Sequence, residues 1–489
     1  MKKIILYLGI LLVANSCIQK TKQVNFLIIS CEDISPYLSF YGDSTAHTPN
    51  LDKLASEGIV FENAFTTVGV CAPNRSSIIT GMYPVSIGTH HMRTGTDIKA
   101  WGKRSYDGNA FKKDQNGDRY CEYSTVLPPD VKCFTTYLRK AGYYCTNTSK
   151  TDYQFSAPLS AWDENGDNAH YKNRKENQPF FAVFNLNVTH ESQIWMSAND
   201  SLRINPQNVS LHPYWPDTDS VRIDMARNYS NIELLDKQVG TLLHELESTG
   251  ELENTIIFFF SDHGGPLARG KRAIYDSGLK VPFIVRFPDG SNTGRNDQLI
   301  SFVDIAPTIL SLAGIKVPDH IQGKAFLGKQ QKVEREYIFG SSDRFDEHYD
   351  RIRCIRNKQY LLVRNYYPDQ PGYLDIAYRK QLPMMREMLR MRNEGKLNQT
   401  QRLWFNAPKP EIEFYDVMAD PDQINDLAQN AGYKEIIDTM LNRLSQWQVE
   451  IDDKGAIPEA KLVKDQWPDF KQPQTKSPTV TKTNERYYA

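Results

Sequence analysis

The 489-residue sequence predicts an α/β fold with a largely parallel sheet, followed by a smaller C-terminal subdomain built on an antiparallel sheet. The first observation is a set of apolar runs bounded by polar residues, typical of buried parallel strands, at 24–30, 180–186, 255–260 and 281–287. The second is the helical spacing of apolar residues at 231–246 and 303–312. Strands that alternate with helices favour a parallel sheet. Beyond about residue 335 the apolar runs shorten, as at 360–363, which indicates antiparallel strands.

Composition and spacing divide the chain into four parts. Its length is sufficient for a large core and more than one domain. We expect the main domain at 24–335 and the C-terminal subdomain at 336–464, which includes a late helix at 433–448 with a core-facing apolar stripe. Residues 465–489 are polar and contain prolines, so we expect a loosely held tail there.

The fourth part, residues 1–16, is typical of an export signal. Lys2 and Lys3 precede an apolar run at 4–13, which is too short to span a membrane, and small residues lead to Cys17. A cysteine in this place resembles a bacterial lipoprotein site. We therefore expect an exported lipoprotein, periplasmic or on the cell surface, that touches the membrane only through a lipid anchor on Cys17. Simple secretion is the alternative.

Net charge and cysteine spacing exclude some classes of partner. The formal net charge is -1, so the chain lacks the broad basic field expected of a nucleic-acid-binding protein. No CxxC spacing suggests a zinc site. In an oxidising compartment Cys121 could pair with Cys133 or Cys145, and the sequence does not decide between them.

Acidic residues follow two of the predicted strands. Glu32 and Asp33 come almost directly after the first strand, and Asp262 ends the strand at 255–260. Because ligand sites in open α/β sheets lie at the carboxyl ends of strands, these carboxylates are expected to converge and repel one another. A divalent cation bound through oxygen, calcium by preference, would resolve the repulsion. The alternative is that these acids cap the helices that follow.

A short motif around Cys71 carries the most information. The order Cys71-Ala72-Pro73-Asn74-Arg75 opens a run with helical character. Pro73 suits the first turn of a helix, so residue 71 would lie at the positive end of the helix dipole, a natural seat for an anion. Arg75, one turn on, would project toward the same end. The plain alternative is a buried apolar cysteine before an ordinary helix.

This motif resembles the signature of the formylglycine-dependent (type I) sulfatases, and the likeness extends over nearly the whole chain after the export signal. The resemblance implies an alkaline-phosphatase-like fold, a large mixed sheet between helices with a smaller C-terminal sheet subdomain. It also implies that a formylglycine-generating maturation enzyme oxidises Cys71 to an aldehyde. The implied activity is hydrolysis of sulfate groups from sulfated carbohydrates, with one divalent cation, Ca²⁺.

The resemblance also assigns roles to residues matched by position. It implies a metal site made by Glu32, Asp33, Asp262, His263 and an oxygen of the modified residue 71. It implies catalytic roles for Arg75, Lys150, Lys271 and His190, the last protonating the leaving group. Asp152 stands where relatives have a histidine, and is expected to act as a base or to contact the sugar. Close after the motif, His90, His91 and Arg93 are candidate glycan contacts, with exposure on a surface loop as the alternative.

The substrate expected from the resemblance is a glycosaminoglycan-type amino sugar. The chain looks most like the heparan N-sulfatase (sulfamidase) branch, so N-sulfoglucosamine is the first expectation and an O-sulfated N-acetylhexosamine is the second. Two other enzyme classes stay open, a phosphoesterase or phosphonate hydrolase of the same superfamily and a cysteine hydrolase using Cys71 and His190. A lipoprotein that binds sulfated glycans without catalysis is the non-enzymatic alternative.

Overall fold

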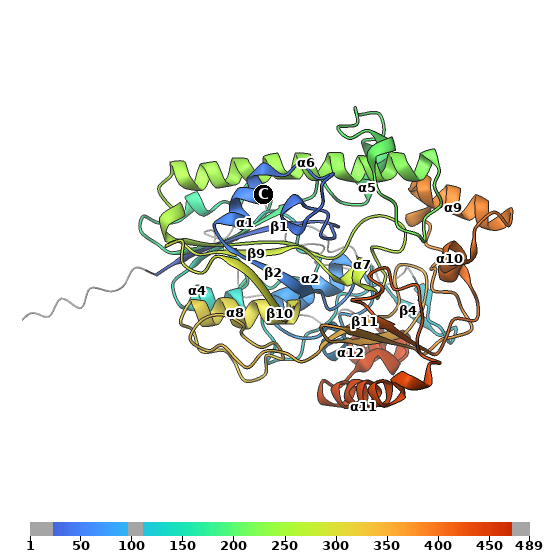
Figure 1. Cartoon of the computed structure of the whole chain (residues 1–489). Helices are drawn as coiled ribbons and strands as arrows, with labels where there is room; N and C mark the ends of the chain where they lie inside the picture. The colour runs from blue at the N-terminus through green and yellow to red at the C-terminus, as the bar shows by residue number, and fades with distance from the viewer. Residues whose placement is uncertain (1–22, 96–110, 472–489) are drawn as a thin grey trace, which may run out of the picture.

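The computed structural model describes residues 23–95 and 111–471, which contain an eight-stranded sheet and a separate four-stranded sheet (Figure 1). The predicted export signal, Cys17 and most of the predicted tail lie outside the described residues. The strands of the large sheet, in spatial order, are β10 (Gly294–Ser301), β2 (Ile59–Phe65), β9 (Phe283–Arg286), β8 (Thr255–Ser261), β1 (Asn25–Cys31), β7 (Phe180–Leu186), β5 (Tyr144–Asn147) and β6 (Glu164–Asn165). The predicted strands at 24–30, 180–186 and 255–260 are confirmed.

Seven of these strands run in one direction and β9 alone runs against its neighbours. β1 pairs in parallel with β7 and β8, whereas β9 pairs antiparallel with both β8 and β2. The prediction of a parallel strand at 281–287 is therefore wrong in direction. All four residues of β9 are buried, so its apolar run looks like that of a parallel strand. The large sheet is mixed, as expected.

Helices cover both faces of the sheet (Figure 1). Leu27 and Ile29 of β1 pack into the core beneath α6, while Phe26 and Ile28 point to the opposite core, as the alternation of a strand requires. The predicted helices at 231–246 and 303–312 correspond to parts of α6 and α8. The helices of the main domain are α1 (Pro49–Ser56), α2 (Cys71–Thr80), α3 (Pro84–Ile87), α4 (Thr135–Lys140), α5 (Ser192–Met196), α6 (Asp219–Ser248), α7 (Asp276–Leu279) and α8 (Ile305–Leu312).

The C-terminal region forms the antiparallel sheet that the sequence predicts. Its strands are β11 (Ile338–Ser342), β12 (Ile352–Arg356), β13 (Tyr360–Asn365) and β14 (Ile412–Asp416), and a hairpin of β3 (Phe111–Lys113) and β4 (Arg119–Cys121) lies outside both sheets. The remaining helices are α9 (Pro383–Asn393), α10 (Gln399–Arg402), α11 (Lys434–Glu450) and α12 (Glu459–Gln466). Phe339 and Trp447 stack at 4.7 Å between ring centroids and join α11 to the sheet.

The start of the predicted tail is part of the packed structure. Helix α12 continues past residue 465, and Trp467 beyond it is buried against Tyr120 and Cys121 of β4. The expectation of a loose tail from residue 465 is therefore wrong for residues 465–467. The polar composition of this segment does not indicate that it packs, because the packing depends on one buried tryptophan.

The described cysteines form no disulfide. Cys121, Cys133 and Cys145 are all free and buried. Cys121 lies in the small cluster around Trp467, whereas Cys133 and Cys145 lie in the core on one face of the large sheet. The suggested pairing of Cys121 is therefore absent, because the partners belong to separate cores. No helix among the described residues is both long enough and apolar enough to cross a membrane.

Asp224 on α6 should make stability depend on pH. It is 2% exposed, its Oδ2 accepts the N–H of Met384 at 2.7 Å, and burial raises its pKa to about 7. Because this exceeds the unfolded value of about 3.9, its stabilising contribution is complete below about pH 4 and is lost as pH rises through 7. Asp224→Asn should raise the free energy of unfolding at pH 8 by about 2–4 kcal/mol, with little change near pH 4.

Urea unfolding at both pH values measures this difference. Asp297→Asn, at a side chain that is 74% exposed, is the control and should show no pH-dependent difference from the unaltered chain. An equal effect of Asp224→Asn at pH 4 and pH 8 would contradict the assignment.

Candidate active site

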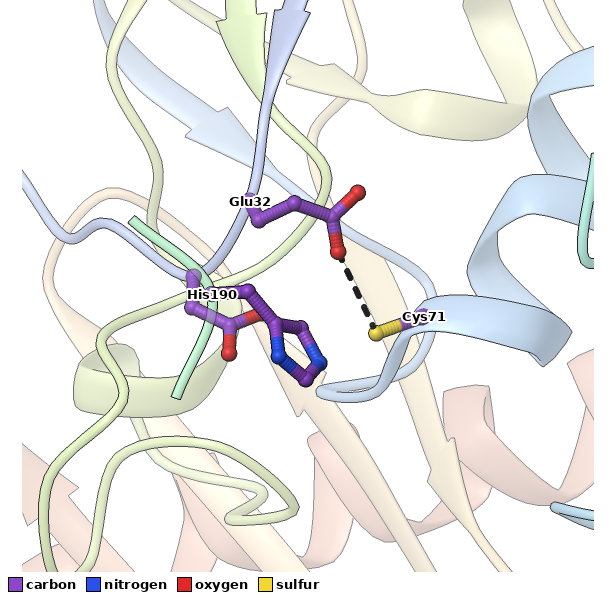
Figure 2. A group of neighbouring side chains, drawn as sticks. Glu32, Cys71 and His190 are labelled. Carbon is purple, nitrogen blue, oxygen red and sulfur yellow. Dashed lines mark hydrogen bonds between the residues drawn. The ribbon is translucent and has the colours of Figure 1, made fainter. Parts of the chain in front are cut away.

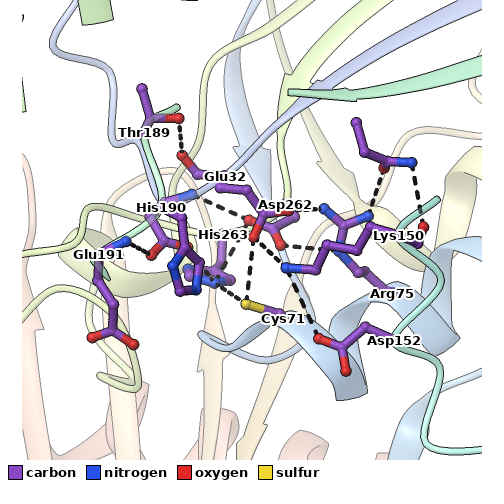
Figure 3. A network of polar contacts seen from close by, with 12 residues as sticks. Glu32, Cys71, Arg75, Lys150, Asp152, Thr189, His190, Glu191, Asp262 and His263 are labelled. Atoms are coloured by element: carbon purple, nitrogen blue, oxygen red, sulfur yellow. Dashed lines mark hydrogen bonds and ion pairs between the residues drawn. The ribbon is translucent and has the colours of Figure 1, made fainter. Parts of the chain in front are cut away.

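The predicted functional residues meet at the carboxyl ends of five parallel strands of the large sheet (Figure 3). Because these strands run in the same direction, their carboxyl ends share one edge of the sheet. The residues and the strands they follow are Glu32 and Asp33 after β1, Cys71 and Arg75 after β2, Lys150 after β5, His190 after β7, and Asp262 and His263 after β8. Lys271 reaches the same place from the loop between β8 and α7.

Cys71 is the first residue of α2 and is completely buried. Its Sγ lies 3.8 Å from Glu32 Oε2 (Figure 2). It also lies 3.1 Å from His263 Nε2 (Figure 3). Burial alone would raise the pKa of the thiol, but the positive charges of Lys150, Lys271 and His263 hold that pKa well below its usual range. The site therefore stabilises negative charge at position 71, as the helix dipole also does.

Two cations neutralise Glu32. Lys150 Nζ lies 2.5 Å from Glu32 Oε2, and Arg75 bonds the other carboxylate oxygen and also donates from Nε to Asp262 Oδ2 at 3.1 Å. Burial opposes ionisation of Glu32, yet Lys150 and Arg75 hold its pKa well below the usual range. By contrast, burial and the charge of Glu32 raise the pKa of Asp262 to about 7. Asp262 is therefore the carboxyl group of this cluster whose ionisation burial opposes most clearly.

Lys271 is held by carboxylates on two sides. Its Nζ donates to Asp33 Oδ2 at 2.7 Å and lies 3.2 Å from Glu191 Oε1. Glu191 in turn accepts two hydrogen bonds from Arg272, at 3.0 and 2.9 Å, and its backbone N–H donates to Asp33 at 2.7 Å. Sequence reasoning missed Glu191 and Arg272. The available clue was their position, since each directly follows a predicted site residue.

His190 lies at the more open side of the cluster. Its ring is half-buried, whereas Lys271 beside it is buried. His190 Nε2 lies 3.2 Å from Lys271 Nζ, and Nδ1 lies 2.9 Å from Ser192 Oγ. Serine and lysine therefore fix the ring orientation, which leaves a titratable group at the mouth of a buried anion site.

Asp152 and Arg93 form an ion pair beside Lys150. Arg93 Nη1 donates to Asp152 Oδ1 at 2.9 Å, and the side chain of Arg93 remains 32% exposed. Asp152 is 1% exposed, and its Oδ2 lies 4.0 Å from Lys150 Nζ and accepts no hydrogen bond from the described residues. A buried carboxylate oxygen without a donor is poised to accept one from a bound group.

His90 and His91 lie behind this pair rather than on a surface loop. They are 1% and 4% exposed, and their rings lie 4.2 Å apart between centroids. Burial lowers the pKa of both imidazoles. The alternative of a surface loop is therefore wrong, and the burial of both side chains also argues against the predicted direct contact with a glycan.

The donor set at the sheet edge fits a divalent cation. Ligand atoms of Asp33, Cys71, Asp262 and His263 lie within 4.8 Å of one another, and all four residues are buried. Asp33 Oδ1 is buried, lies 3.0 Å from His263 Nε2 and accepts no hydrogen bond within the described part of the chain. Converging carboxylates with a spare oxygen are the ligands that hard cations prefer. Glu32 borders the same cluster.

A profile of the family described as Sulfatase matches residues 24–315, more than half of the chain. The chain belongs to the sulfatase family. A second profile, described as N-sulphoglucosamine sulphohydrolase, C-terminal, matches residues 268–403. These matches confirm the family and the enzyme class that the Cys71 motif predicts. Members of this family generally use a metal ion and a formylglycine.

Relatives named as sulfatases or sulphohydrolases match most of this chain. An ulvan-active sulfatase of Formosa agariphila is 44% identical over 497 residues, covering 94% of this chain and 80% of the relative. The human N-sulphoglucosamine sulphohydrolase is 23% identical and covers 91% of this chain and 93% of its own. A solved sulfatase in complex with D-glucosamine-2-N,6-O-disulfate superposes with a TM-score of 0.60, at 18% identity, over 90% of this chain and all of its own. The expected fold is thereby confirmed.

Removal of a divalent cation should lower thermal stability through this site. A ligand that binds only the folded state adds about 2.7 kcal/mol at a hundredfold excess over its Kd. We therefore expect EDTA-treated protein to melt several degrees higher when calcium is restored, with magnesium compared alongside. Asp33→Asn should greatly reduce this shift because it replaces a charged carboxylate ligand by a neutral amide.

Asp350→Asn is the matched control for this experiment. Asp350 is also buried and pairs with Lys409, away from the cluster. That variant should melt lower yet keep the calcium-dependent shift. An undiminished cation-dependent shift in the Asp33→Asn protein would contradict the proposed ligands.

Proposed function

We propose that this sulfatase removes sulfate groups from ulvan. The supporting observation is the 44% identity, over 94% of this chain, to a relative named an ulvan-active sulfatase. Two further relatives with that name are 27% and 28% identical. Identity of this extent favours a shared substrate class more strongly than likeness at 23% does.

N-sulfoglucosamine is the second candidate substrate. The profile match at 268–403 and the human relative carry that name and support the first expectation from the sequence. The human relative is less similar to this chain, at 23% identity, than the relative at 44% identity. The profile match covers only residues 268–403. A relative named N-acetylglucosamine-6-O-sulfatase, at 22% identity, supports an O-sulfated N-acetylhexosamine as a third candidate.

Cys71 is the position of the nucleophile in this proposal. Formylglycine formed from Cys71 supplies the group that reacts with sulfur, and a bound calcium ion supplies positive charge that favours the reaction. Glu32, Asp33, Asp262 and His263 would hold the ion. Calcium is preferred because three of these four ligands offer carboxylate oxygens.

The chain's own cations bind and stabilise the sulfate. Arg75, Lys150 and Lys271 surround Cys71 with positive charge that is fixed by buried carboxylates before any substrate arrives. Such preorganised charge stabilises the negative charge that develops on sulfate oxygens. Exclusion of water from this buried cluster strengthens the effect.

His190 donates the proton to the leaving oxygen. Its half-buried ring lies between the buried Lys271 and the more open side, where a sugar would leave. Arg93, partly exposed beside Asp152, is placed to contact that sugar, and Asp152 Oδ2 is a spare acceptor for one of its hydroxyl groups. This arrangement separates sulfate binding by the lysines from sugar binding by Arg93 and Asp152.

Sulfate release from a substrate panel tests the activity and the substrate together. Protein co-produced with a formylglycine-generating enzyme should release sulfate from ulvan oligosaccharides faster than from N-sulfoglucosamine or O-sulfated N-acetylhexosamine. Cys71→Ala should abolish release, while Cys354→Ala, at a buried cysteine of the C-terminal sheet, should not. Release from N-sulfoglucosamine alone would replace ulvan by the second candidate.

The leaving group tests the role of His190. A sugar alcohol is a poor leaving group that needs a proton, whereas 4-nitrophenolate leaves readily without one. His190→Ala should therefore lower kcat for a sulfated sugar by 10²–10⁴-fold and lower kcat for 4-nitrophenyl sulfate much less. Equal losses on both substrates would rule out proton donation by His190.

A further inference from the structure

A second cleft lies in the C-terminal region, outside the catalytic cluster. Its volume is about 630 Å³. It opens between the turn of the β3–β4 hairpin, the loop after β13 and the segment that precedes α12. Aromatic rings and side-chain amides line it: Tyr349, Tyr366, Tyr367, Gln115, Asn116 and Gln370. Such a mixture of flat apolar surface and paired donors and acceptors suits a sugar ring with its hydroxyl groups.

Two of the tyrosines form rigid walls. The hydroxyl of Tyr349 bonds Glu459, which is buried and bonds Arg344 through both carboxylate oxygens. The hydroxyl of Tyr366 donates to Gln448 Oε1 of α11 at 2.8 Å. Because both side chains are fixed, a ligand that contacts these walls does not have to order them first.

The other polar groups in the cleft are free to bind a ligand. The hydroxyl of Tyr367 and the side-chain amides of Gln115, Asn116 and Gln370 make no hydrogen bond to any residue of the described ranges. Amides of this kind can donate and accept at once, as neighbouring hydroxyls of a sugar require.

Unpaired positive charge adjoins the cleft. The guanidinium carbons of Arg351 and Arg364 lie 4.1 and 4.9 Å from the ring centroid of Tyr366. Within residues 23–95 and 111–471 neither arginine forms an ion pair, and Arg351 Nε is buried without a hydrogen-bond partner. Asp369 is the charged residue on the lining itself. Two unpaired arginines against one aspartate favour an anionic ligand.

Two segments connect this cleft to the catalytic cluster. The ring of Tyr349 lies 6.2 Å from that of His91, and Arg93, two residues further on, pairs with Asp152. The loop that lines the cleft continues to Tyr378, whose ring lies 6.5 Å from that of His190. The eight residue-to-residue steps from Gln370 to Tyr378 span at most about 28 Å. The cleft therefore lies within the reach of a polymer that is bound at the catalytic residues.

We propose that this cleft is a polymer subsite, which holds further anionic sugar units of the polysaccharide whose sulfate the catalytic residues remove. The inference rests on the proposed function, since it requires a sulfated polysaccharide as substrate. The cleft contributes affinity for the chain and takes no part in the reaction at sulfur.

Binding without turnover tests the subsite. In affinity electrophoresis through gels that contain ulvan, the Cys71→Ala protein should migrate more slowly than in plain gels. Adding Tyr367→Ala should weaken this retardation five- to tenfold in apparent Kd, and Arg364→Gln should weaken it and reduce its dependence on salt. The matched control is Tyr137→Ala, at a half-buried tyrosine of α4 on the main domain whose hydroxyl likewise bonds no described residue.

The outcomes separate the subsite from the proposed function. Equal retardation of the Tyr367→Ala and Tyr137→Ala proteins would overturn the subsite, provided that both melt as the parent does. If ulvan causes no retardation, the same gels with heparin test the subsite for another sulfated polysaccharide, and no retardation in either overturns it. Sulfate release from ulvan oligosaccharides judges the proposed function independently.

Discussion

The attraction between buried carboxylates and buried cations at one edge of the large sheet organises the rest of the site. Glu32, Asp33 and Asp262 lie against Arg75, Lys150 and Lys271, and each group alone would be costly to bury. Together they neutralise one another and hold every reactive group in one orientation. Asp33 Oδ1, which is buried and accepts no hydrogen bond from the described residues, is the oxygen left for a divalent cation to bind.

The sheet makes this concentration of charge possible. Parallel strands deliver their carboxyl ends to one edge, so residues far apart in sequence meet without long loops. Asn74 then fixes the first turn of α2 against that edge. Its Oδ1 accepts from the backbone N–H of Thr67 at 3.1 Å, and its Nδ2 donates to the backbone oxygen of Asp262 at 2.5 Å. The position of Cys71 thus depends on backbone contacts as well as on charge.

Most of the site was predictable from the sequence because its residues follow apolar strands that are easily recognised. Glu32, Asp33 and Asp262 are found in this way, and the Cys71 motif carries its own helix start. The direction of β9 was not predictable, because a strand buried on both faces looks the same in either direction. The Glu191–Arg272 pair was also missed, since its meaning appears only when two loops 81 residues apart meet. The burial of His90 and His91 was not predicted for the same reason, because it depends on contacts with segments that are distant in the sequence.

The complete burial of Cys71 has a consequence for how the active protein is made. In the proposed function, a second enzyme would have to oxidise Cys71 while α2 is not yet docked, because a side chain with no exposed surface cannot enter another active site. Folding and oxidation would then compete on each new chain. A chain that folded first would be stable but inert, so the fraction of competent molecules would depend on the relative rates of the two processes rather than on any equilibrium property of the finished fold.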